Sequence, residues 1–346
     1  MRVVYMLDPV DRLILDESPE PTGRVLVIDA PGLAGEVGAR GWDAVAYCDS
    51  LLDERLLTVP VVEELTVGSL AGVDLVLLRL PKSVAALEEY AQRLALVPGV
   101  RVVAGGRVKH MTRGMNEALA TRFAEVSASL GRQKSRVLHA SGPRPGGIDF
   151  PRTARDADLD LPLAAHGGTF AGTRVDPGTR LLVSVLDRVP SATVVEERGT
   201  SVSKPSNFTC IDLGSGNGTL SALLARAGHR VLALDESRAA CLATAVTAAA
   251  NGVSVEVRRA DALEGVAPGS VPLIVCNPPF HVGTAKDSAP GLAMIDDAAR
   301  ALAPRGELWL VFNAHLPYLP RLRRIGRTEI VARNPKFIVT RSVRGS

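Results

Sequence analysis

The chain has 346 residues, 46% of them hydrophobic and 22% charged, a length and a mixture that predict a globular protein of two domains. A formal net charge of +3 is too small to identify a nucleic-acid-binding protein by itself, and an aromatic content of 4% argues against extensive base stacking along a single strand. Four widely spaced cysteines, an N-terminus that reaches charge early and the lack of a long apolar run argue against a zinc site, a disulfide framework, a signal peptide and a membrane span, so we expect a reduced, cytoplasmic protein.

The N-terminal half shows a faint alternation of strands and helices. Its residues 25–32, 41–49 and 73–82 resemble, in that order, residues 210–216, 228–235 and 272–279 of the C-terminal half. A duplication would explain this resemblance, and two unrelated α/β domains are the alternative. Because the first copy has lost most of the glycines that let a backbone close on a nucleotide, we expect it to be non-catalytic.

Two stretches of the chain are rich in basic residues. Residues 101–136 contain eight Lys or Arg against Glu117 and Glu125, and residues 321–346 contain eight against Glu329 alone. Each phosphate that a cation neutralises releases counterions, so either stretch is a candidate nucleic-acid contact. The alternative for both is an ordinary solvated face.

Residues 139–166 are predicted to connect the two domains. They contain four prolines, two adjacent glycines and an acidic patch, with little periodicity. We therefore predict a first domain over residues 1–150 and a second over residues 151–346.

The C-terminal half alternates strands and helices clearly. Apolar, strand-like runs are predicted at residues 208–213, 230–234, 254–258, 272–276, 307–313, 328–332 and 337–342. Helices are predicted at residues 219–227, 238–250 and 292–303. Continuous apolar strands separated by helices indicate a parallel sheet covered on both faces, and the last two strands predict a closing antiparallel hairpin.

A glycine-rich turn follows the first strand of this half, with the sequence Asp-Leu-Gly-Ser-Gly-Asn-Gly from Asp212 to Gly218. Glycine lets the main chain turn tightly and approach a ligand closely. The acidic residue of this turn, Asp212, would attract the positive amino group of a methionine moiety and repel a pyrophosphate. A dinucleotide dehydrogenase is therefore the weaker alternative. Asp235 and Asp261 end the next two strands. The Asp235 carboxylate can accept hydrogen bonds from both ribose hydroxyls, and the Asp261 carboxylate can accept one from an adenine amine. The predicted cofactor-binding residues are Asp212, Gly214, Gly216, Gly218, Asp235, Asp261 and Asn277.

The segment Asn277-Pro278-Pro279-Phe280 closes the fourth strand, beside the glycine turn. The Asn277 side-chain oxygen and the Pro278 carbonyl can each accept one hydrogen of an exocyclic amine, which directs the nitrogen lone pair towards a methyl donor. The prolines fix the backbone, and Phe280 offers a face for an extruded base. We predict Asn277, Pro278, Pro279 and Phe280 as catalytic, without a metal.

On these motifs, nearly the whole chain resembles the bacterial ribosomal RNA guanine-N2 methyltransferases of the small- and large-subunit type. Asn-Pro-Pro-Phe-His at 277–281 matches the family signature, which is more specific than the four-residue form of adenine and glutamine methylases. Phe170 with residues 176–182 resembles its lead-in helix, and residues 313–318 and 334–337 resemble its C-terminal signature. Ser215 stands where the family frequently has Cys.

The resemblance implies two tandem class I methyltransferase-like, Rossmann-like folds, of which only the second binds S-adenosylmethionine. It implies a methyltransferase that acts on the N2 amine of a guanine in ribosomal RNA, with RNA or a ribosomal subunit as the partner. The alternatives are adenine N6, a protein glutamine, or an RNA-binding assembly factor without catalysis. The RNA-binding residues expected from this resemblance are Arg107, Lys109, Arg113, Lys134, Arg136 and His281.

Overall fold

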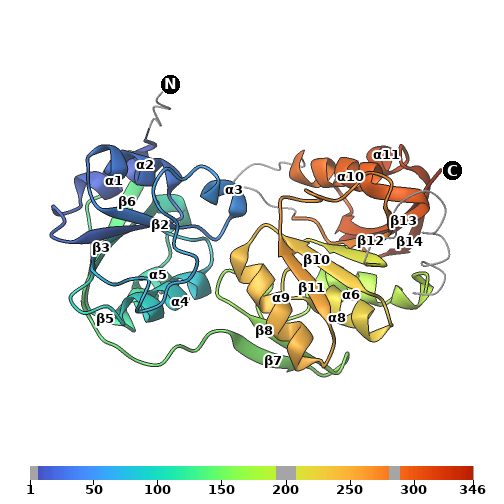
Figure 1. Ribbon diagram of the computed structural model, residues 1–346, viewed down its shortest axis with the longest axis horizontal. Coiled ribbons are helices and arrows are strands. Elements are labelled where there is room, and N and C mark those ends of the chain that lie inside the picture. The colour runs from blue at the N-terminus through green and yellow to red at the C-terminus, as the bar shows by residue number, and fades with distance from the viewer. Residues whose placement is uncertain (1–6, 192–207, 280–288, 346) are drawn as a thin grey trace. The chain divides into compact units, whose positions relative to one another are not determined.

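The computed structural model describes residues 7–191, 208–279 and 289–345 (Figure 1). The chain divides into two compact units. Unit 1 comprises Met1–Pro151 and His166–Gly168, and unit 2 comprises Arg152–Ala165 and Thr169–Ser346. No helix among the described residues is both long and apolar enough to span a bilayer.

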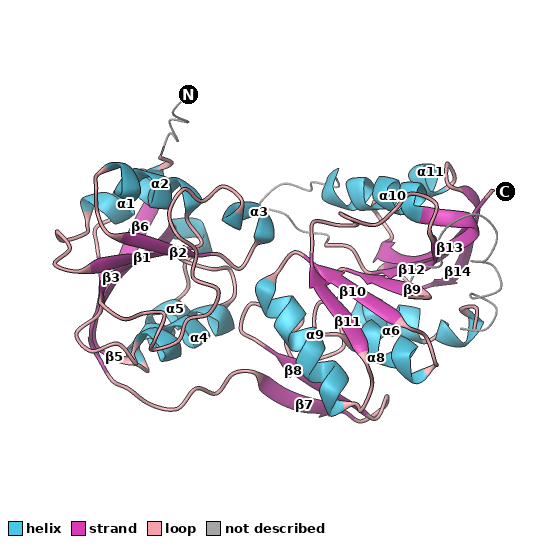
Figure 2. Ribbon diagram, viewed as in Figure 1, coloured by secondary structure: helices cyan, strands magenta, loops and turns pink. Residues whose placement is uncertain are grey.

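Unit 1 is built on a six-stranded sheet with the order β2-β1-β3-β4-β6-β5, covered by helices on both faces (Figure 2). The first four strands of this order are parallel, and the β5–β6 hairpin is antiparallel. The strands are β1 (Arg24–Ile28), β2 (Ala44–Tyr47), β3 (Val73–Arg79), β4 (Arg101–Arg107), β5 (Phe123–Ala128) and β6 (Ser135–Pro143). The helices are α1 (Pro9–Asp16), α2 (Pro31–Ala39), α3 (Leu51–Glu54), α4 (Val84–Leu94), α5 (Arg113–Ala120) and the short 3₁₀ helix η1 (Val108–His110).

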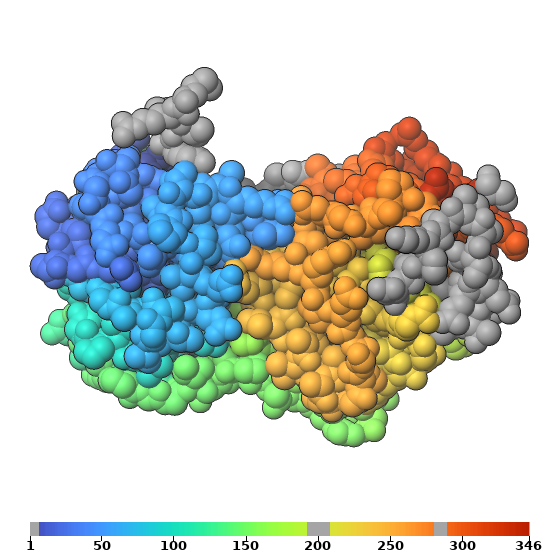
Figure 3. All heavy atoms as spheres, viewed as in Figure 1, coloured from blue at the N-terminus to red at the C-terminus, as the bar shows by residue number. Residues whose placement is uncertain are grey.

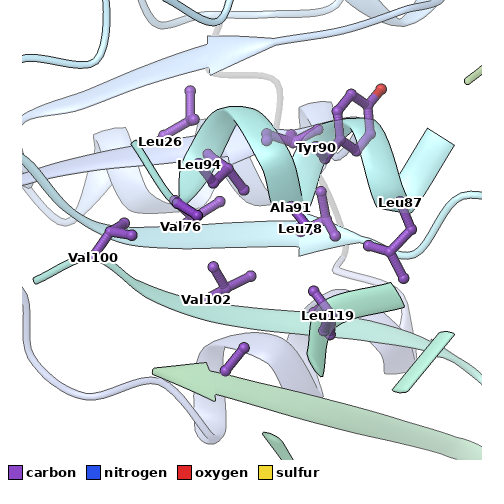
Figure 4. Packing of buried hydrophobic residues seen from close by; sticks show 14 of the residues in the cluster. Leu26, Val76, Leu78, Leu87, Tyr90, Ala91, Leu94, Val100, Val102 and Leu119 are labelled. Atoms are coloured by element: carbon purple, nitrogen blue, oxygen red, sulfur yellow. The ribbon is translucent and has the colours of Figure 1, made fainter. Parts of the chain in front are cut away.

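The core of unit 1 forms where α4 and α5 cover one face of the sheet. Ser83 caps the N-terminus of α4 by accepting a hydrogen bond from the Ala86 amide, at 3.3 Å. The buried side of α4 packs on alternate residues of β1, β3 and β4 (Figure 4), because successive residues of a strand point to opposite faces. The residues labelled in this cluster are Leu26, Val76, Leu78, Leu87, Tyr90, Ala91, Leu94, Val100, Val102 and Leu119.

Unit 2 is built on a seven-stranded sheet with the order β11-β10-β9-β12-β13-β15-β14, which confirms the predicted parallel sheet with a closing antiparallel hairpin. The strands are β9 (Cys210–Leu213), β10 (Val231–Asp235), β11 (Val255–Arg259), β12 (Val271–Cys276), β13 (Leu302–Asn313), β14 (Gly326–Arg333) and β15 (Phe337–Arg344). The helices are α6 (Pro177–Val183), η2 (Leu186–Arg188), α8 (Thr219–Arg226), α9 (Arg238–Ala250), α10 (Ala289–Ala301) and α11 (Leu319–Leu322). The predicted boundary between α10 and β13 was wrong, because Leu302 and Ala303 begin β13 rather than end α10.

The predicted connection between the two domains contains the passage from unit 1 to unit 2, after Pro151, but it also contains strands that its low periodicity did not predict. Its first residues complete β6 in unit 1, and β7 (Arg152–Asp156) and β8 (Leu161–Ala165) form an antiparallel ribbon that packs beside α9 in unit 2 (Figure 3). Side chains of α9 hold this ribbon through its backbone: Asn251 donates to the Pro162 carbonyl at 2.7 Å, and the Thr247 hydroxyl accepts from the Ala164 amide at 2.9 Å. Exposed polar residues on β7 hide its strand character in the sequence.

The two sheets correspond strand for strand except at β11, which has no counterpart strand in unit 1 among the described residues. Ile28 pairs with Leu78 and Tyr47 in unit 1, as Leu213 pairs with Cys276 and Leu234 in unit 2. The next residues therefore correspond as well: Asp29 to Gly214, Cys48 to Asp235, and Arg79 to Asn277. This shared register favours the duplication and corrects the alignment from sequence, which set Pro81 rather than Arg79 against Asn277.

Candidate active site

The glycine turn lies between β9 and α8, at the carboxyl end of the parallel strands of unit 2. Gly214 and Gly216 both adopt left-handed backbone conformations, with φ of 79° and 54°. A Cβ added to Gly216 would meet no atom within 4 Å, and one on Gly214 would lie 3.8 Å from the Asn277 carbonyl oxygen. Gly216 therefore leaves open space above the turn, and the predicted catalytic segment borders Gly214.

Gly218 has a different reason to be glycine. It precedes α8 with φ of 77°, and a Cβ there would lie 2.9 Å from the Thr244 Cα of α9. The missing side chain thus lets the turn pass close to α9. Direct contact of Gly218 with a cofactor stays a prediction.

Asp235 ends β10 and braces the turn. One carboxylate oxygen accepts from the Gly216 amide at 3.0 Å, and the other accepts from the Ser237 amide at 2.9 Å. Asp261 is exposed just beyond β11, the edge strand next to β10. Both carboxylates stand at the same edge of the sheet as the turn, as the positions of their strands predicted.

Asp212 lies behind the turn rather than above it. Its side chain is fully buried, and one oxygen accepts from the Ser221 hydroxyl of α8 at 2.6 Å. Burial raises the pKa of this carboxyl to about 7. Its other oxygen receives no hydrogen bond from any described residue. The predicted contact of Asp212 with a methionine amino group stays a prediction.

Asn277 follows β12, and the structure fixes the orientation of its amide. Its nitrogen donates to Asp176 at 3.1 Å and to the Thr179 hydroxyl at 2.8 Å. Rotating the amide by half a turn would set its oxygen against the Asp176 carboxylate, so the observed orientation is the favoured one. Within the part of the chain that the structure describes, Asn277 Oδ1 has no donor. The oxygen is therefore an acceptor whose orientation is fixed by the bonds of the amide nitrogen.

The rest of the predicted catalytic segment is described only in part. Pro278 is buried and Pro279 is exposed. Phe280 and His281 lie outside the described residues.

A small cavity joins the glycine turn to Asn277 and to a loop that precedes α6. Its lining residues are Phe170, Ala171, Asp176, Thr179, Gly214, Ser215, Gly216, Asn217, Thr219, Leu220 and Asn277. Asn217 links the turn to the loop, because its side-chain nitrogen donates to the carbonyls of Gly172 and Arg174 at 2.8 and 2.9 Å. Asn217 and Thr179 were not among the predicted site residues. Asn217 could have been suspected from its place inside the glycine motif.

We expect Asn217→Ala to weaken the affinity for S-adenosylhomocysteine about tenfold, measured by calorimetry, because the loop loses both amide contacts. Asn251→Ala is the matched control, since Asn251 also donates to two carbonyls, those of Pro162 and Thr247, but outside this cavity. Equal affinities of the two variants would show that the Asn217 bridge does not shape the cavity.

Only part of the first basic stretch is free to meet a ligand. Arg101 pairs with Asp74, Arg113 with Glu117, and Arg132 with Glu17. The Arg107 guanidinium donates to the Gln133 carbonyl at 3.2 Å. Among the described residues, the exposed cations of this stretch that form no ion pair or hydrogen bond are Lys109, Lys134 and Arg136.

These three cations gather at one end of unit 1. The Val108 amide at the start of η1 donates to the Lys134 carbonyl at 3.0 Å, which joins η1 to the turn between β5 and β6. Gln133 and Lys134 form the tip of that turn in left-handed conformations, with φ of 49° and 60°. Nearby in the chain, the Leu130 side chain is 86% exposed.

The second basic stretch is partly neutralised within the fold. Arg321 pairs with Asp296, Arg341 pairs with Glu307 and Glu329, and Arg344 donates to the carbonyl of Arg300. The remaining cations of this stretch are exposed and lie around β14: Arg323, Arg324, Arg327, Arg333 and Lys336.

Comparison with known proteins identifies two matching family models. Residues 160–341 match the Methyltransferase small domain, and residues 57–144 match the RLMG N-terminal domain. Two curated relatives, from Streptomyces avermitilis and Pseudomonas aeruginosa, are each named ribosomal RNA large subunit methyltransferase G. The first is 35% identical over 79% of this chain and 71% of its own length, and the second is 36% identical over 78% and 70%.

The fold also matches a solved structure. A T. thermophilus 16S rRNA N2 G1207 methyltransferase, RsmC, determined with AdoMet and guanosine, aligns with a TM-score of 0.76 at 23% identity. The alignment covers 97% of this chain and 92% of that protein. At this identity the match concerns the fold, and it extends over both units.

Proposed function

Because this chain belongs to the ribosomal RNA large subunit methyltransferase G family of S-adenosylmethionine-dependent enzymes, we propose that it methylates the exocyclic N2 amine of a guanine in ribosomal RNA. The observation that carries the proposal is the Asn277 amide beside the glycine turn, whose oxygen receives no hydrogen bond from any residue that the structure describes. An acceptor fixed in this way suits a substrate that brings its own N–H groups.

The residues of the cavity fit the cofactor. The open space above Gly216 leaves room for a ligand, and the absence of a side chain on Gly214 keeps the turn clear where it borders the predicted catalytic segment. We assign binding of the cofactor to Gly214, Gly216, Asp235, Asp261 and Asn277. Asp212 and Gly218, which shape the turn, stay predicted members of the same site. When bound, S-adenosylmethionine supplies a methyl group on a sulfonium, which is already an activated leaving group.

The chain's own contribution is to prepare the amine. The nitrogen of an exocyclic amine is a poor nucleophile because its lone pair is delocalised into the ring. In our proposal, Asn277 Oδ1 accepts one amine hydrogen and the Pro278 carbonyl accepts the other, so the nitrogen stays closer to tetrahedral and its lone pair is directed at the methyl carbon. Phe280 stacks on the extruded base, and His281 contacts RNA.

The test of this function is methylation of RNA by the full chain. The purified protein is given labelled S-adenosylmethionine and either ribosomal RNA or ribosomal subunits from a strain that lacks the gene, and the label is located in nucleosides and in protein by mass spectrometry. We expect label in N2-methylguanosine. Label in N6-methyladenosine or in a protein glutamine would reassign the acceptor, and no label in RNA or in ribosomal subunits would favour an assembly factor.

We also propose that unit 1 holds the RNA through Lys109, Lys134 and Arg136, with Arg107 and Arg113 beside them. The exposed cations whose side chains have no partner among the residues described support this choice, because a cation that already pairs with a carboxylate has less charge to offer a phosphate. The end of unit 1 that corresponds to the glycine turn of unit 2 is closed by its own side chains. Asp29 occupies the place of Gly214 and accepts from the Tyr90 hydroxyl at 2.9 Å and from the Asp49 amide at 2.9 Å.

We expect the double variant Lys134→Gln/Arg136→Gln to bind a ribosomal RNA fragment about tenfold more weakly. The slope of log affinity against log salt should fall by about 1 to 2, because two phosphate contacts are lost. Arg24→Gln/Arg40→Gln removes the same charge from unit 1, but there each Arg is paired with a carboxylate, Asp43 and Glu36. If both doubles reduce affinity and slope equally, the contact is only a general charge effect.

A further inference from the structure

We infer that Asp176 and Thr179 are positioning residues for the methyl transfer: they hold the Asn277 amide so that its oxygen faces the substrate amine. This inference rests on the proposed function, in which Asn277 is catalytic. It adds two side chains that lie about a hundred residues earlier in the chain, on and before the first turn of α6.

Both N–H groups of the Asn277 side chain are engaged in hydrogen bonds. A side-chain amide has two N–H donors, and here one meets the Asp176 carboxylate and the other the Thr179 hydroxyl. The Asp176 oxygen that receives Asn277 also accepts from the backbone amides of Gly178 and Thr179, at 2.8 and 3.1 Å. The carboxylate is thereby fixed as the N-cap of α6, and a fixed acceptor in turn fixes the amide.

Unit 1 contains the same arrangement at the corresponding positions. Asp8 caps α1 as Asp176 caps α6, and the two helices share the pattern Asp-Pro-x-x-Arg-Leu. Arg79, the counterpart of Asn277 by strand register, donates to Asp8 and, at 2.8 Å, to Asp11, the counterpart of Thr179. A bond from the end of the central strand to the cap and the first turn of this helix thus occurs twice in the chain.

The difference between the copies indicates what the arrangement does in unit 2. In unit 1 the residue at the strand end is an arginine, a donor only, and its two partners are both carboxylates, so the result is an ion-paired lock. In unit 2 it is an amide, which has an acceptor left after both N–H groups are engaged. Because Thr179 stands where unit 1 has a second acid, Asn277 faces a single carboxylate, that of Asp176. A neutral N–H donor is enough to satisfy that carboxylate.

The physical consequence is a pre-set acceptor. A free amide rotates about its last side-chain bond and would present its oxygen and its NH₂ group alternately to the substrate. An NH₂ group facing the guanine amine would set donor against donor. Holding the oxygen forward removes this wrong orientation before the substrate arrives, and errors of this kind can cost about a hundredfold in rate.

The test compares substitutions that change the acceptors but keep the helix cap or the volume. Thr179→Val keeps the shape and removes the hydroxyl, Thr179→Ser keeps the hydroxyl, and Asp176→Ser keeps an N-cap with a shorter reach. We expect Thr179→Val and Asp176→Ser to lower kcat for RNA methylation about 10- to 100-fold, with S-adenosylhomocysteine affinity changed less than about threefold. Thr179→Ser should stay within about threefold of the parent kcat.

Thr340→Val is the matched control, because it removes a buried hydroxyl that donates within the sheet of unit 2, to the Leu310 carbonyl. It should leave kcat unchanged. Thr179→Val with normal kcat, or Thr179→Ser as impaired as Thr179→Val, overturns the inference when Asn277→Ala is inactive. Full activity of Asn277→Ala overturns the catalytic role of Asn277, and the inference with it. The proposed function fails only if the parent protein itself does not form N2-methylguanosine.

Discussion

Replacing Asn277 by alanine is expected to reduce methyl transfer on the order of a thousandfold while leaving the fold intact. The variant loses the fixed oxygen that accepts an amine hydrogen, and removal of one such group from a prepared active site costs about 10²- to 10³-fold in rate. It also releases the Asp176 and Thr179 acceptors, both of which lie at a cavity that water can enter. The measurement is single-turnover methylation of ribosomal RNA with labelled cofactor.

The same protein samples should lose no more than about tenfold in affinity for S-adenosylhomocysteine by calorimetry, because Asn277 is only one of the five residues that we assign to the cofactor. This separates catalysis from cofactor binding, since an interaction made only in the transition state lowers kcat without weakening ground-state binding. A cell-level comparison completes the test. If Asn277→Ala supports growth and ribosome assembly as the parent does, and the parent methylates nothing, the chain acts as an assembly factor.

The second large effect is expected from Asp235→Ala, which should weaken binding of S-adenosylhomocysteine about a hundredfold. The Asp235 carboxylate accepts from the backbone amides of Gly216 and Ser237, and hydrogen bonds to a charged group contribute about 1.5–3 kcal/mol each. Without it the glycine turn loses its brace, and the ligand loses an acceptor for its ribose. Calorimetric titration gives the affinity directly.

Glu236→Ala is the control, since it removes the neighbouring, exposed carboxylate from the same loop. The affinity of Asp235→Asn for S-adenosylhomocysteine should lie between those of Asp235→Ala and Glu236→Ala, because an amide keeps one acceptor oxygen. An affinity of Asp235→Ala within threefold of Glu236→Ala would mean that the turn holds its shape without Asp235, and our assignment of the cofactor site would have to move.

The sequence by itself determined the sheet of unit 2 and predicted the place of its candidate active site. Short apolar runs, glycines at left-handed positions and the Asn277 segment are local signals, and the carboxyl ends of adjacent parallel strands bring them to one edge whatever the rest of the chain does. The same reasoning from local signals did not predict the strands between residues 139 and 166. There, β7 has mostly exposed polar residues, and its partner strand is held by α9, far away in the chain.

Only the tertiary structure decided which side chains meet at the candidate site. Asn277 meets Asp176 and Thr179 across 101 and 98 residues, and such a distant hydrogen bond leaves no periodicity in a sequence. Charge counting likewise could not separate Lys134 and Arg136 from cations such as Arg321, which a carboxylate 25 residues away already neutralises. Composition and spacing specify the elements, because those depend on neighbours in the chain. The hydrogen-bond and ion-pair partners of a side chain depend on strand register and packing, which exist only once the sheet has formed.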